Sequence, residues 1–187
     1  MEQLLTGLLD YSSMSQDELR PEPVKLKKVL FDALTILEAD ISAKHAVITV
    51  EDSPHIVSAH PATTVAITAN LISNALKFMP PDIQPQIRIW TEEVRNTPSD
   101  EAAASTPYIR LSIQDNGIGI DQKYLDKIFG VFERLHGKEK YPGSGLGLAI
   151  VKKGAERMGG RVGVQSELNK GSHFWIDLPK ASGSWLE

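Results

Sequence analysis

Two glycine-rich turns carry residue types and spacings that suit ligand chemistry. The first is DNGIGI, residues Asp115–Ile120, and the second is GSGLGL, residues Gly143–Leu148. Glycine lets a backbone turn tightly and approach a ligand closely, but one such loop alone is weak evidence. Two loops favour a shared cause, namely a nucleotide whose base meets the carboxylate of Asp115 and whose phosphates meet glycine backbone. Two unrelated turns, with Asp115 as an ordinary turn residue, are the alternative.

The segment ANLISNALKF, residues Ala69–Phe78, supplies a third set of polar groups. On a helix that advances about 100° per residue, Asn70, Asn74 and Lys77 fall on one narrow stripe. The adjacent face is apolar and comprises Ile67, Leu71, Ala75 and Phe78. Two amide oxygens one turn apart suit Mg²⁺ that is shared with phosphates, and the ammonium suits the phosphates themselves. A solvated polar face is the alternative, which the poor helix propensity of asparagine weakens.

The second glycine cluster precedes and opens a helix, where free amide groups and the helix dipole favour phosphate. Its G-x-G-x-G spacing matches neither the Rossmann fingerprint nor a P-loop. The segment between the two clusters includes GVFERLHGKEKYP, residues Gly130–Pro142. Its aromatic residues are placed to anchor its ends, while Arg134, Lys138 and Lys140 face a triphosphate; a solvated loop is the alternative.

Composition limits the class of protein. The chain has 187 residues, of which 41% are hydrophobic and 24% charged, enough for one globular α/β core with a short appendage. A net charge of −4 without a basic run argues against binding to nucleic acid. The absence of cysteine excludes disulfides, thiolate zinc sites and cysteine nucleophiles. No apolar run is long enough to span a membrane, and no signal-peptide pattern occurs. A cytoplasmic location is therefore expected, and the parent protein could be soluble or membrane-anchored.

Hydrophobic periodicity predicts alternating helices and strands. Helices are expected over 1–20, 26–43, from Pro61 to before Pro80, 121–129 and 145–158; strands over 47–51, 55–59, 86–94, 108–114, 161–166 and 173–178. Pro21 and Pro23 mark a boundary. The predicted organisation is a helix end over 1–20, one domain over 21–180 and a tail over 181–187, with an exposed hairpin loop over 96–107.

Four segments together resemble a known family. In order and spacing, ANLISNALKF, DNGIGI, IFGVFERL and GSGLGLAIVKK resemble the N, G1, F and G2 boxes of sensor histidine kinases of two-component signalling. The longer run from VFERLHG to ERMGG is similar to the phytochrome-type branch. The resemblance covers roughly residues 24–179 and implies a Bergerat-type ATP-binding fold, a two-layer α/β sandwich with a mixed five-stranded sheet on three helices. It also implies an ATP lid between Phe132 and Gly145.

The resemblance implies roles for individual residues. Asn74 is expected to ligate Mg²⁺, with Asn70 beside it on metal or phosphate, and Asp115 to hold the adenine amine. Asn70, Lys77 and Arg134 are expected to be the catalytic residues. ATP is expected to be held by Asn70, Asn74, Lys77, Asp115, Gly117, Gly119, Ile120, Phe132, Gly143, Ser144, Gly145, Leu146, Gly147 and Leu148. Gly171 in NKGSHF matches the last glycine turn of the family, although a turn between strands explains it equally well.

Asn70 also bears on the reaction. Relatives of this fold that hydrolyse ATP, such as gyrase, MutL proteins and heat-shock chaperones, carry a glutamate at this position. An amide cannot act as a general base, which favours phosphoryl transfer over hydrolysis.

A histidine kinase also needs a phosphoacceptor histidine followed by an acidic residue. None of the five histidines has this setting: His45, His55, His60, His136 and His173. Residues 1–20 resemble the end of the second helix of the family's dimerisation hairpin. The expected protein is therefore the catalytic fragment, whose partners are its own dimerisation and phosphoacceptor domain in a homodimeric parent, and a response regulator. A nucleotide-sensing pseudokinase and a hydrolytic ATPase of the same fold are the alternatives.

Overall fold

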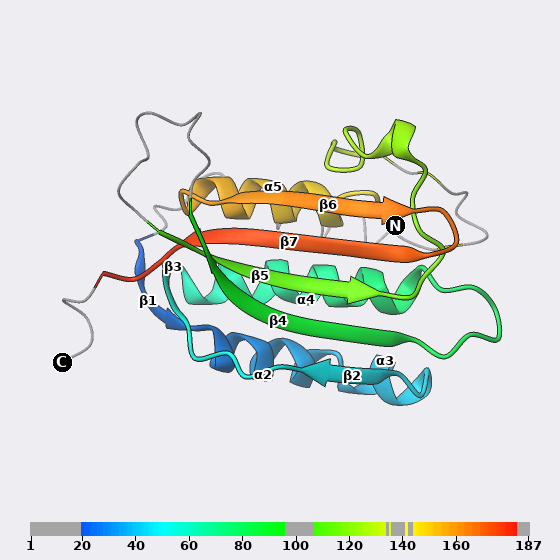
Figure 1. The fold of residues 1–187 in the computed structure, drawn as a ribbon, viewed down its shortest axis with the longest axis horizontal. Coiled ribbons are helices and arrows are strands. Elements are labelled where there is room, and N and C mark those ends of the chain that lie inside the picture. Colours follow the sequence, from blue (N-terminus) through cyan, green and yellow to red (C-terminus); the bar gives the residue numbers. More distant parts are fainter. Residues whose placement is uncertain (1–19, 96–106, 134, 136–140, 142–143, 183–187) are drawn as a thin grey trace.

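The computed structural model describes residues 20–95, 107–133, 135, 141 and 144–182 (Figure 1). Several predictions lie wholly or largely outside these residues. They are the helix over 1–20, the loop over 96–107, the tail over 181–187, and the roles of Arg134 and Gly143.

A mixed sheet of five strands forms one layer of the fold (Figure 1). Its order is β2-β4-β5-β7-β6, with bounds β2 Val47–Val50, β4 Gln86–Val94, β5 Tyr108–Asp115, β6 Arg161–Glu167 and β7 Gly171–Pro179. β2 pairs parallel with β4, and the other neighbours pair antiparallel. Every second residue of β4 and β5 points into the core: Ile87, Ile89, Ile109, Leu111 and Ile113. The predicted sheet is confirmed.

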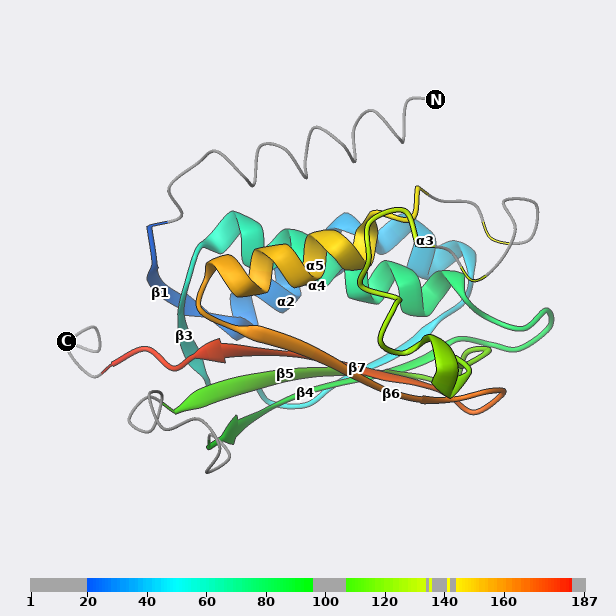
Figure 2. The same ribbon diagram turned by 90° about the horizontal axis from the view of Figure 1, so that it is seen from above.

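Helices cover one face of this sheet and form the second layer (Figure 2). They are α2 Leu26–Ile36, α4 Pro61–Lys77 and α5 Gly147–Arg157, with the short α3 Glu38–Ala43 following α2. Their apolar stripes and the inner face of the sheet share one hydrophobic core. This arrangement confirms the predicted two-layer α/β sandwich. Within the described ranges, no helix combines the length and apolarity that crossing a membrane requires.

Local sequence explains where α4 begins and ends. His60 is the N-cap, and its side chain accepts a hydrogen bond from the backbone N–H of Thr63 at 3.3 Å. Pro61 occupies the first helical turn, where its missing N–H costs nothing. The helix ends at Lys77, before the pair Pro80 and Pro81. These signals fix the two ends of α4.

The N-terminal part of the fold differs from the prediction in two respects. The single helix expected over 26–43 is wrong, because the backbone of Leu37 leaves helical geometry and separates α2 from α3. A strand not predicted, β1 Glu22–Lys25, pairs antiparallel with β3 Ile56–Ala59. Pro23 is tolerated there because β1 is an edge strand of this two-stranded sheet.

The helix expected over 121–129 is also wrong. Only Gln122–Tyr124 forms a short 3₁₀ turn, and single-turn hydrogen bonds follow it. The side chain of Asp121 caps the turn by accepting from the N–H of Lys123 at 3.1 Å. Ile128 is buried and lines the pocket described below, so burial of this side chain shapes the segment more than helix propensity does.

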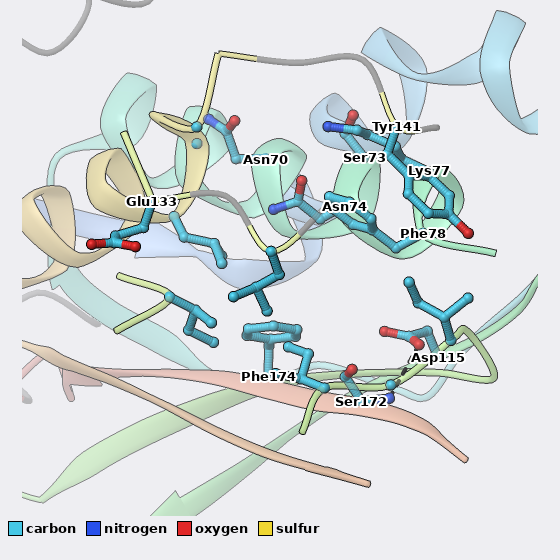
Figure 3. Close-up of a pocket in the computed structure, with 18 of the residues that line it drawn as sticks. Asn70, Ser73, Asn74, Lys77, Phe78, Asp115, Glu133, Tyr141, Ser172 and Phe174 are labelled. Carbon is cyan, nitrogen blue, oxygen red and sulfur yellow. Dashed lines mark hydrogen bonds between the residues drawn. The ribbon is translucent and has the colours of Figure 1, made fainter. Parts of the chain in front are cut away.

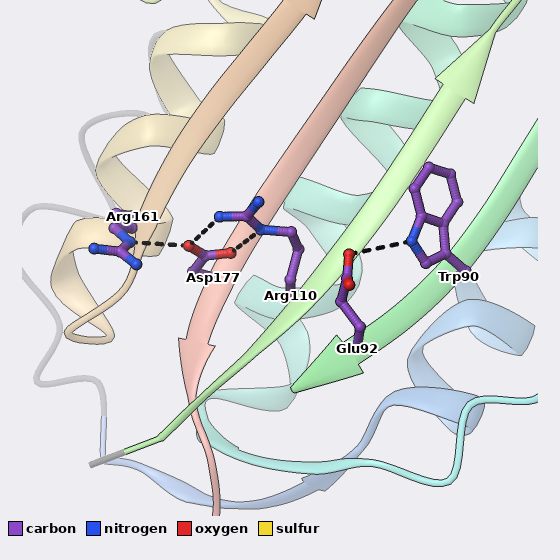
Figure 4. Close-up of polar contacts among 5 residues, drawn as sticks. All are labelled: Trp90, Glu92, Arg110, Arg161 and Asp177. Carbon is purple, nitrogen blue, oxygen red and sulfur yellow. Dashed lines mark hydrogen bonds and ion pairs between the residues drawn. The ribbon is translucent and has the colours of Figure 1, made fainter. Parts of the chain in front are cut away.

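The other face of the sheet carries a cross-strand row of charges (Figure 4). Asp177 is fully buried and accepts two hydrogen bonds from Arg110, at 2.7 and 2.9 Å, and one from Arg161 at 2.9 Å. The bond to Asp177 raises the pKa of Arg110. A buried carboxylate is tolerated here because two guanidinium groups satisfy it. This row holds β5, β6 and β7 in register.

Candidate functional site

A cavity of about 410 Å³ lies between α4, the start of α5 and the sheet (Figure 3). Its volume is in the range of small-molecule sites. Ten of the residues predicted to bind a nucleotide line it: Asn70, Asn74, Lys77, Asp115, Gly119, Ile120, Ser144, Gly145, Gly147 and Leu148. The structure therefore brings together three motifs that are far apart in the sequence.

α4 supplies one wall of the cavity. Asn70 donates through Nδ2 to the carbonyl oxygen of Ala66 at 3.1 Å, which orients its amide and leaves Oδ1 on the side of α5. Gly147 packs against that oxygen, since a Cβ atom on Gly147 would lie 3.2 Å from Asn70 Oδ1. Asn74 lies one turn further toward the middle of the pocket (Figure 3). The polar stripe predicted for this helix thus faces a cavity and not bulk solvent.

Lys77 and the residue that follows it form one corner of the pocket. The ammonium of Lys77 lies 4.5 Å from the centroid of the Phe78 ring. Lys77 is two helical turns, about 10 Å, beyond Asn70 along the helix axis. Its predicted contact with phosphate stays a prediction.

Asp115 ends β5 at the far end of the cavity from Asn70 (Figure 3). Its Oδ1 accepts hydrogen bonds from the backbone N–H groups of Gly117 at 2.8 Å and Ser172 at 3.1 Å. Among the described residues, no hydrogen-bond donor reaches Oδ2. Burial raises the pKa of Asp115 to about 6, against the lowering effect of the two N–H groups. At neutral pH this carboxylate is ionised and ready to accept a hydrogen bond from a ligand.

Small residues and hydroxyls hold Asp115 and its loop. Gly171, with φ of +90°, lies so close to the backbone of Asp115 that a Cβ atom would overlap the Asp115 carbonyl oxygen. Ser166 accepts from the backbone N–H of Ile120 at 2.8 Å and lies 2.9 Å from the hydroxyl of Ser172. Strands β6 and β7 therefore position the first glycine loop, a contribution that the turn motif alone does not reveal.

The second glycine cluster forms the entry to α5. Leu146 is the N-cap residue, and its N–H donates to Ser144 Oγ at 3.3 Å. The first turn of α5 has backbone N–H groups without partners inside the helix, and its residues Gly147 and Leu148 line the cavity. A helix N-terminus that opens on a cavity is suited to phosphate.

Some predicted residues lie off the cavity wall. Phe132 is 54% exposed, and only its backbone takes part, because its N–H donates to the carbonyl oxygen of Gly145 at 3.1 Å. Leu146 is 1% exposed and belongs to the hydrophobic core. Gly117 packs against the Phe78 carbonyl and acts through Asp115. Their predicted contact with a ligand stays a prediction. The bond between Phe132 and Gly145 joins the two ends predicted for the lid.

Sequence reasoning missed several lining residues. They are Ser73, Phe78, Ile118, Ile128, Glu133, Leu135, Tyr141, Ser172 and Phe174. Ser172 follows the glycine already noted at 171, and Tyr141 is an aromatic residue at the end of the loop expected to be anchored. The apolar members of this set give the cavity apolar walls in addition to the carboxylate and the asparagines. A ligand with a flat apolar body, an amine at one end and anionic groups at the other would match this lining.

A divalent cation fits the asparagine end of the pocket. Asn70 and Asn74 offer amide oxygens one turn apart, which are suitable ligands for Mg²⁺ together with phosphate oxygens and water. Within the residues that the structure describes, no group of three or more His, Cys, Asp or Glu side chains could hold a metal. A metal in this pocket would thus depend on the amides and on the ligand.

Comparisons with known proteins agree with this geometry. The family model for histidine kinase-, DNA gyrase B- and HSP90-like ATPases matches residues 59–182. Cyanobacterial phytochrome A of Nostoc sp. is 35% identical over 179 residues, which cover 96% of this chain and 22% of that protein. Sensor protein GacS of Pseudomonas syringae pv. syringae is 34% identical over 187 residues, covering 95% of this chain and 20% of that protein.

The fold has a solved counterpart in the mycobacterial sensor histidine kinase MprB. The two structures have a TM-score of 0.69 and 26% sequence identity, over 86% of this chain and 97% of that one.

The chain belongs to the family of histidine kinase-, DNA gyrase B- and HSP90-like ATPases. The resemblance to sensor histidine kinases drawn from the four boxes is confirmed. The chain spans about one fifth of the length of the two curated relatives named above. Because their identities are nearly equal, the phytochrome-type branch stays a prediction.

Proposed function

We propose that the cavity binds ATP, with the adenine at Asp115 and the phosphates at the asparagine end. The observation that carries this proposal is the buried carboxylate of Asp115, which keeps one oxygen available while two N–H groups hold the other. An exocyclic amine is the donor that such an acceptor selects, and a guanine carbonyl at the same place would be repelled. The amides at the start of α5 and the ammonium of Lys77 supply the positive character that a triphosphate needs.

Asn74 and Asn70 would hold Mg²⁺ beside the phosphates. When bound, the ion neutralises phosphate charge and polarises the transferred group. The bond from Asn70 to the carbonyl oxygen of Ala66 holds its amide in place before any ligand arrives. Gly147 keeps that amide close to the start of α5, so the metal ligand and the phosphate-binding amides form one preorganised unit.

The reaction we propose is transfer of the γ-phosphoryl group to a histidine. A ring nitrogen of the acceptor attacks the γ-phosphorus, the bond from that phosphorus to the bridging oxygen breaks, and ADP leaves. The pocket residues Asn70, Asn74 and Lys77 position the triphosphate for this attack. Hydrolysis is disfavoured because Asn70 stands where a general base would be needed, and an amide cannot accept a proton from water.

The acceptor histidine is proposed to lie on another segment. Four histidines of this chain are described, and none lines the pocket. His55 bonds Thr91 at 2.7 Å, His60 caps α4, and His173 stacks on Trp90 with ring centroids 4.9 Å apart. His45 occupies a turn with φ of +49°. The names of the relatives, which include a sensor protein and a sensor histidine kinase, support a place in signalling. We further propose a dimeric parent, a cytoplasmic kinase region and a response regulator as partner.

Phosphoryl transfer in trans tests this proposal. The chain is incubated with Mg²⁺ and γ-labelled ATP together with a separately prepared histidine-bearing dimerisation hairpin from a sensor kinase of the same family. We expect label on the hairpin, and none when its histidine is replaced or Mg²⁺ is chelated. Binding of ATP without transfer to any hairpin would support a nucleotide-sensing module, and steady release of free phosphate would support a hydrolytic ATPase.

A further inference from the structure

Tyr141 is a buried member of the pocket wall that the family boxes leave without a role. Its side chain is 8% exposed, and its hydroxyl donates to the carbonyl oxygen of Met79 at 3.1 Å. Its ring lies 5.2 Å from the ring of Phe78, tilted by 52°. A tyrosine near a glycine cluster is thus held by both its ring and its hydroxyl against the segment that follows α4.

That segment is also tied to the adenine end of the pocket. The carbonyl oxygen of Phe78 accepts from the N–H of Ile118 at 2.9 Å, and Gly117 packs against the same carbonyl. The carbonyl group of Phe78 therefore contacts the first glycine loop, and the carbonyl group of the next residue, Met79, contacts Tyr141. The two-residue segment is a shared support for the first glycine loop and for Tyr141.

We propose that Tyr141 is a positioning residue that limits where Ser144 and Gly145 lie, so that the amides of residues 144–148 face the phosphates of a nucleotide bound at Asp115. This inference rests on the proposed binding of ATP. Tyr141 does not need to touch the reacting atoms. Its hydroxyl acts through the backbone of Met79 to set the distance between the base end and the phosphate end of the pocket.

Chain geometry supports this role. Tyr141 is three residues before Ser144, so Ser144 lies within about 11 Å of it along any path of the chain. On the other side, Leu146 is buried in the core next to Ser144 and Gly145. Buried side chains at positions 141 and 146 therefore lie on either side, in the sequence, of the half-buried Ser144 and Gly145, both of which line the pocket. Releasing one of them lets this backbone move and weakens its contact with phosphate.

The test compares Tyr141→Phe with Tyr108→Phe. Tyr108 is a matched control, since its hydroxyl also donates to a backbone carbonyl, that of Gly159 at 3.3 Å, and it does not line the pocket. Affinities for ATP and for adenosine are measured by competition against a fluorescent nucleotide. We expect Y141F to bind ATP about fivefold to tenfold more weakly, as for loss of one buried hydrogen bond, and adenosine equally well. Y108F should match the wild type for both.

Other outcomes overturn the inference. Equal weakening of ATP and adenosine would make Tyr141 a wall of the base site only, and no change would remove it from the site. A Y141F protein that is unfolded without ligand, while Y108F is folded, would show that the hydroxyl only holds the fold.

A second measurement does not depend on ATP. In the ligand-free protein, hydrogen exchange at the amides of residues 145–148 should be faster in Y141F than in Y108F. Equal exchange rates in the two variants would overturn the inference, whether or not the protein binds ATP. Failure of the wild type to bind ATP would instead count against the proposed function.

Discussion

Gly171 lies directly against the backbone of Asp115, and any side chain at position 171 would overlap the Asp115 carbonyl oxygen. The next residue, Ser172, donates its N–H to the Asp115 carboxylate at 3.1 Å. The first two residues of β7 therefore set both the backbone and the side chain of Asp115. This explains why a glycine that reads as a plain turn between strands belongs to the pocket.

Gly171→Ala is expected to weaken ATP binding as well as stability. Gly159→Ala is the matched control, because Gly159 has a similar φ of +71° but its Cβ would meet only Pro179 Cγ at 3.7 Å. Both variants carry the strain of a positive φ, about 1–2 kcal/mol. Only Gly171→Ala also displaces Asp115, so it should lose ATP affinity in calorimetric titration, whereas Gly159→Ala should lose thermal stability alone. Equal ATP affinity in the two variants would separate Gly171 from the site.

ATP affinity should rise with pH through the pKa of Asp115. Burial raises this pKa to about 6, and only the ionised carboxylate accepts a hydrogen bond from an amine. We expect affinity at pH 5 to be about tenfold weaker than at pH 8, from the fraction ionised. Because ATP itself titrates, the comparison is with Asp115→Asn, which should lack the part of the pH dependence that Asp115 contributes. Parallel profiles for the two proteins would contradict the assignment.

The same raised pKa predicts how stability changes without ligand. The folded state binds a proton at Asp115 more tightly than the unfolded state, whose pKa is near the ordinary 3.8. Stability from this group is therefore present at low pH and is lost as pH rises from about 4 to 6, by roughly 3 kcal/mol. Urea unfolding across this range should show the loss in the wild type relative to Asp115→Asn.

Two buried serines of the sheet should respond oppositely to alanine. Ser166 Oγ bonds the N–H of Ile120, the carbonyl oxygen of Gly171 and the hydroxyl of Ser172. Ser166→Ala should therefore destabilise the protein by about 1–3 kcal/mol. Ser112 Oγ is buried with no hydrogen-bond partner among the described residues, so Ser112→Ala should be neutral or slightly stabilising in urea unfolding. Equal losses would contradict the role given to the Ser166 hydroxyl.

Asn74→Ala should remove the effect of Mg²⁺ on ATP affinity. Loss of an oxygen ligand is expected to weaken metal-dependent binding by about tenfold or more. ATP binding without Mg²⁺ should change little, because Asp115 and the amides of α5 are untouched. Ser73→Ala is the control, since Ser73 lines the same pocket on the same helix. A full response to Mg²⁺ in Asn74→Ala would remove this residue from the metal site.

Much of the fold was predictable because its signals are local. Strands β4 and β5 alternate apolar and polar residues along their length, and α4 has a proline at its start and prolines after its end. The pairing of β1 with β3 was not predictable in this way. It joins residues more than thirty positions apart, and Pro23 reads locally as a break. The break at Leu37 was not predictable from periodicity either, because its side chain is buried, as a continuous helix would also have it, although its backbone ends the helix.

The site was predictable where one motif supplies adjacent side chains, as with Asn70 and Asn74 on one helix face. It was not predictable where distant segments meet. Phe174 and Ser172 reach the cavity from β7, and Tyr141 joins it through a bond to Met79. Such contacts depend on how strands are ordered in the sheet, which periodicity does not report.

Calorimetric titration of the chain with ATP, with and without Mg²⁺ and with GTP as control, tests the central claim most directly. We predict saturable binding that is stronger with Mg²⁺ and prefers adenine to guanine by about tenfold or more, as expected when a buried acceptor loses its donor. Equal affinity for GTP would contradict the role of Asp115 in reading the base. No binding of ATP under any of these conditions would contradict the assignment of the cavity as the nucleotide site.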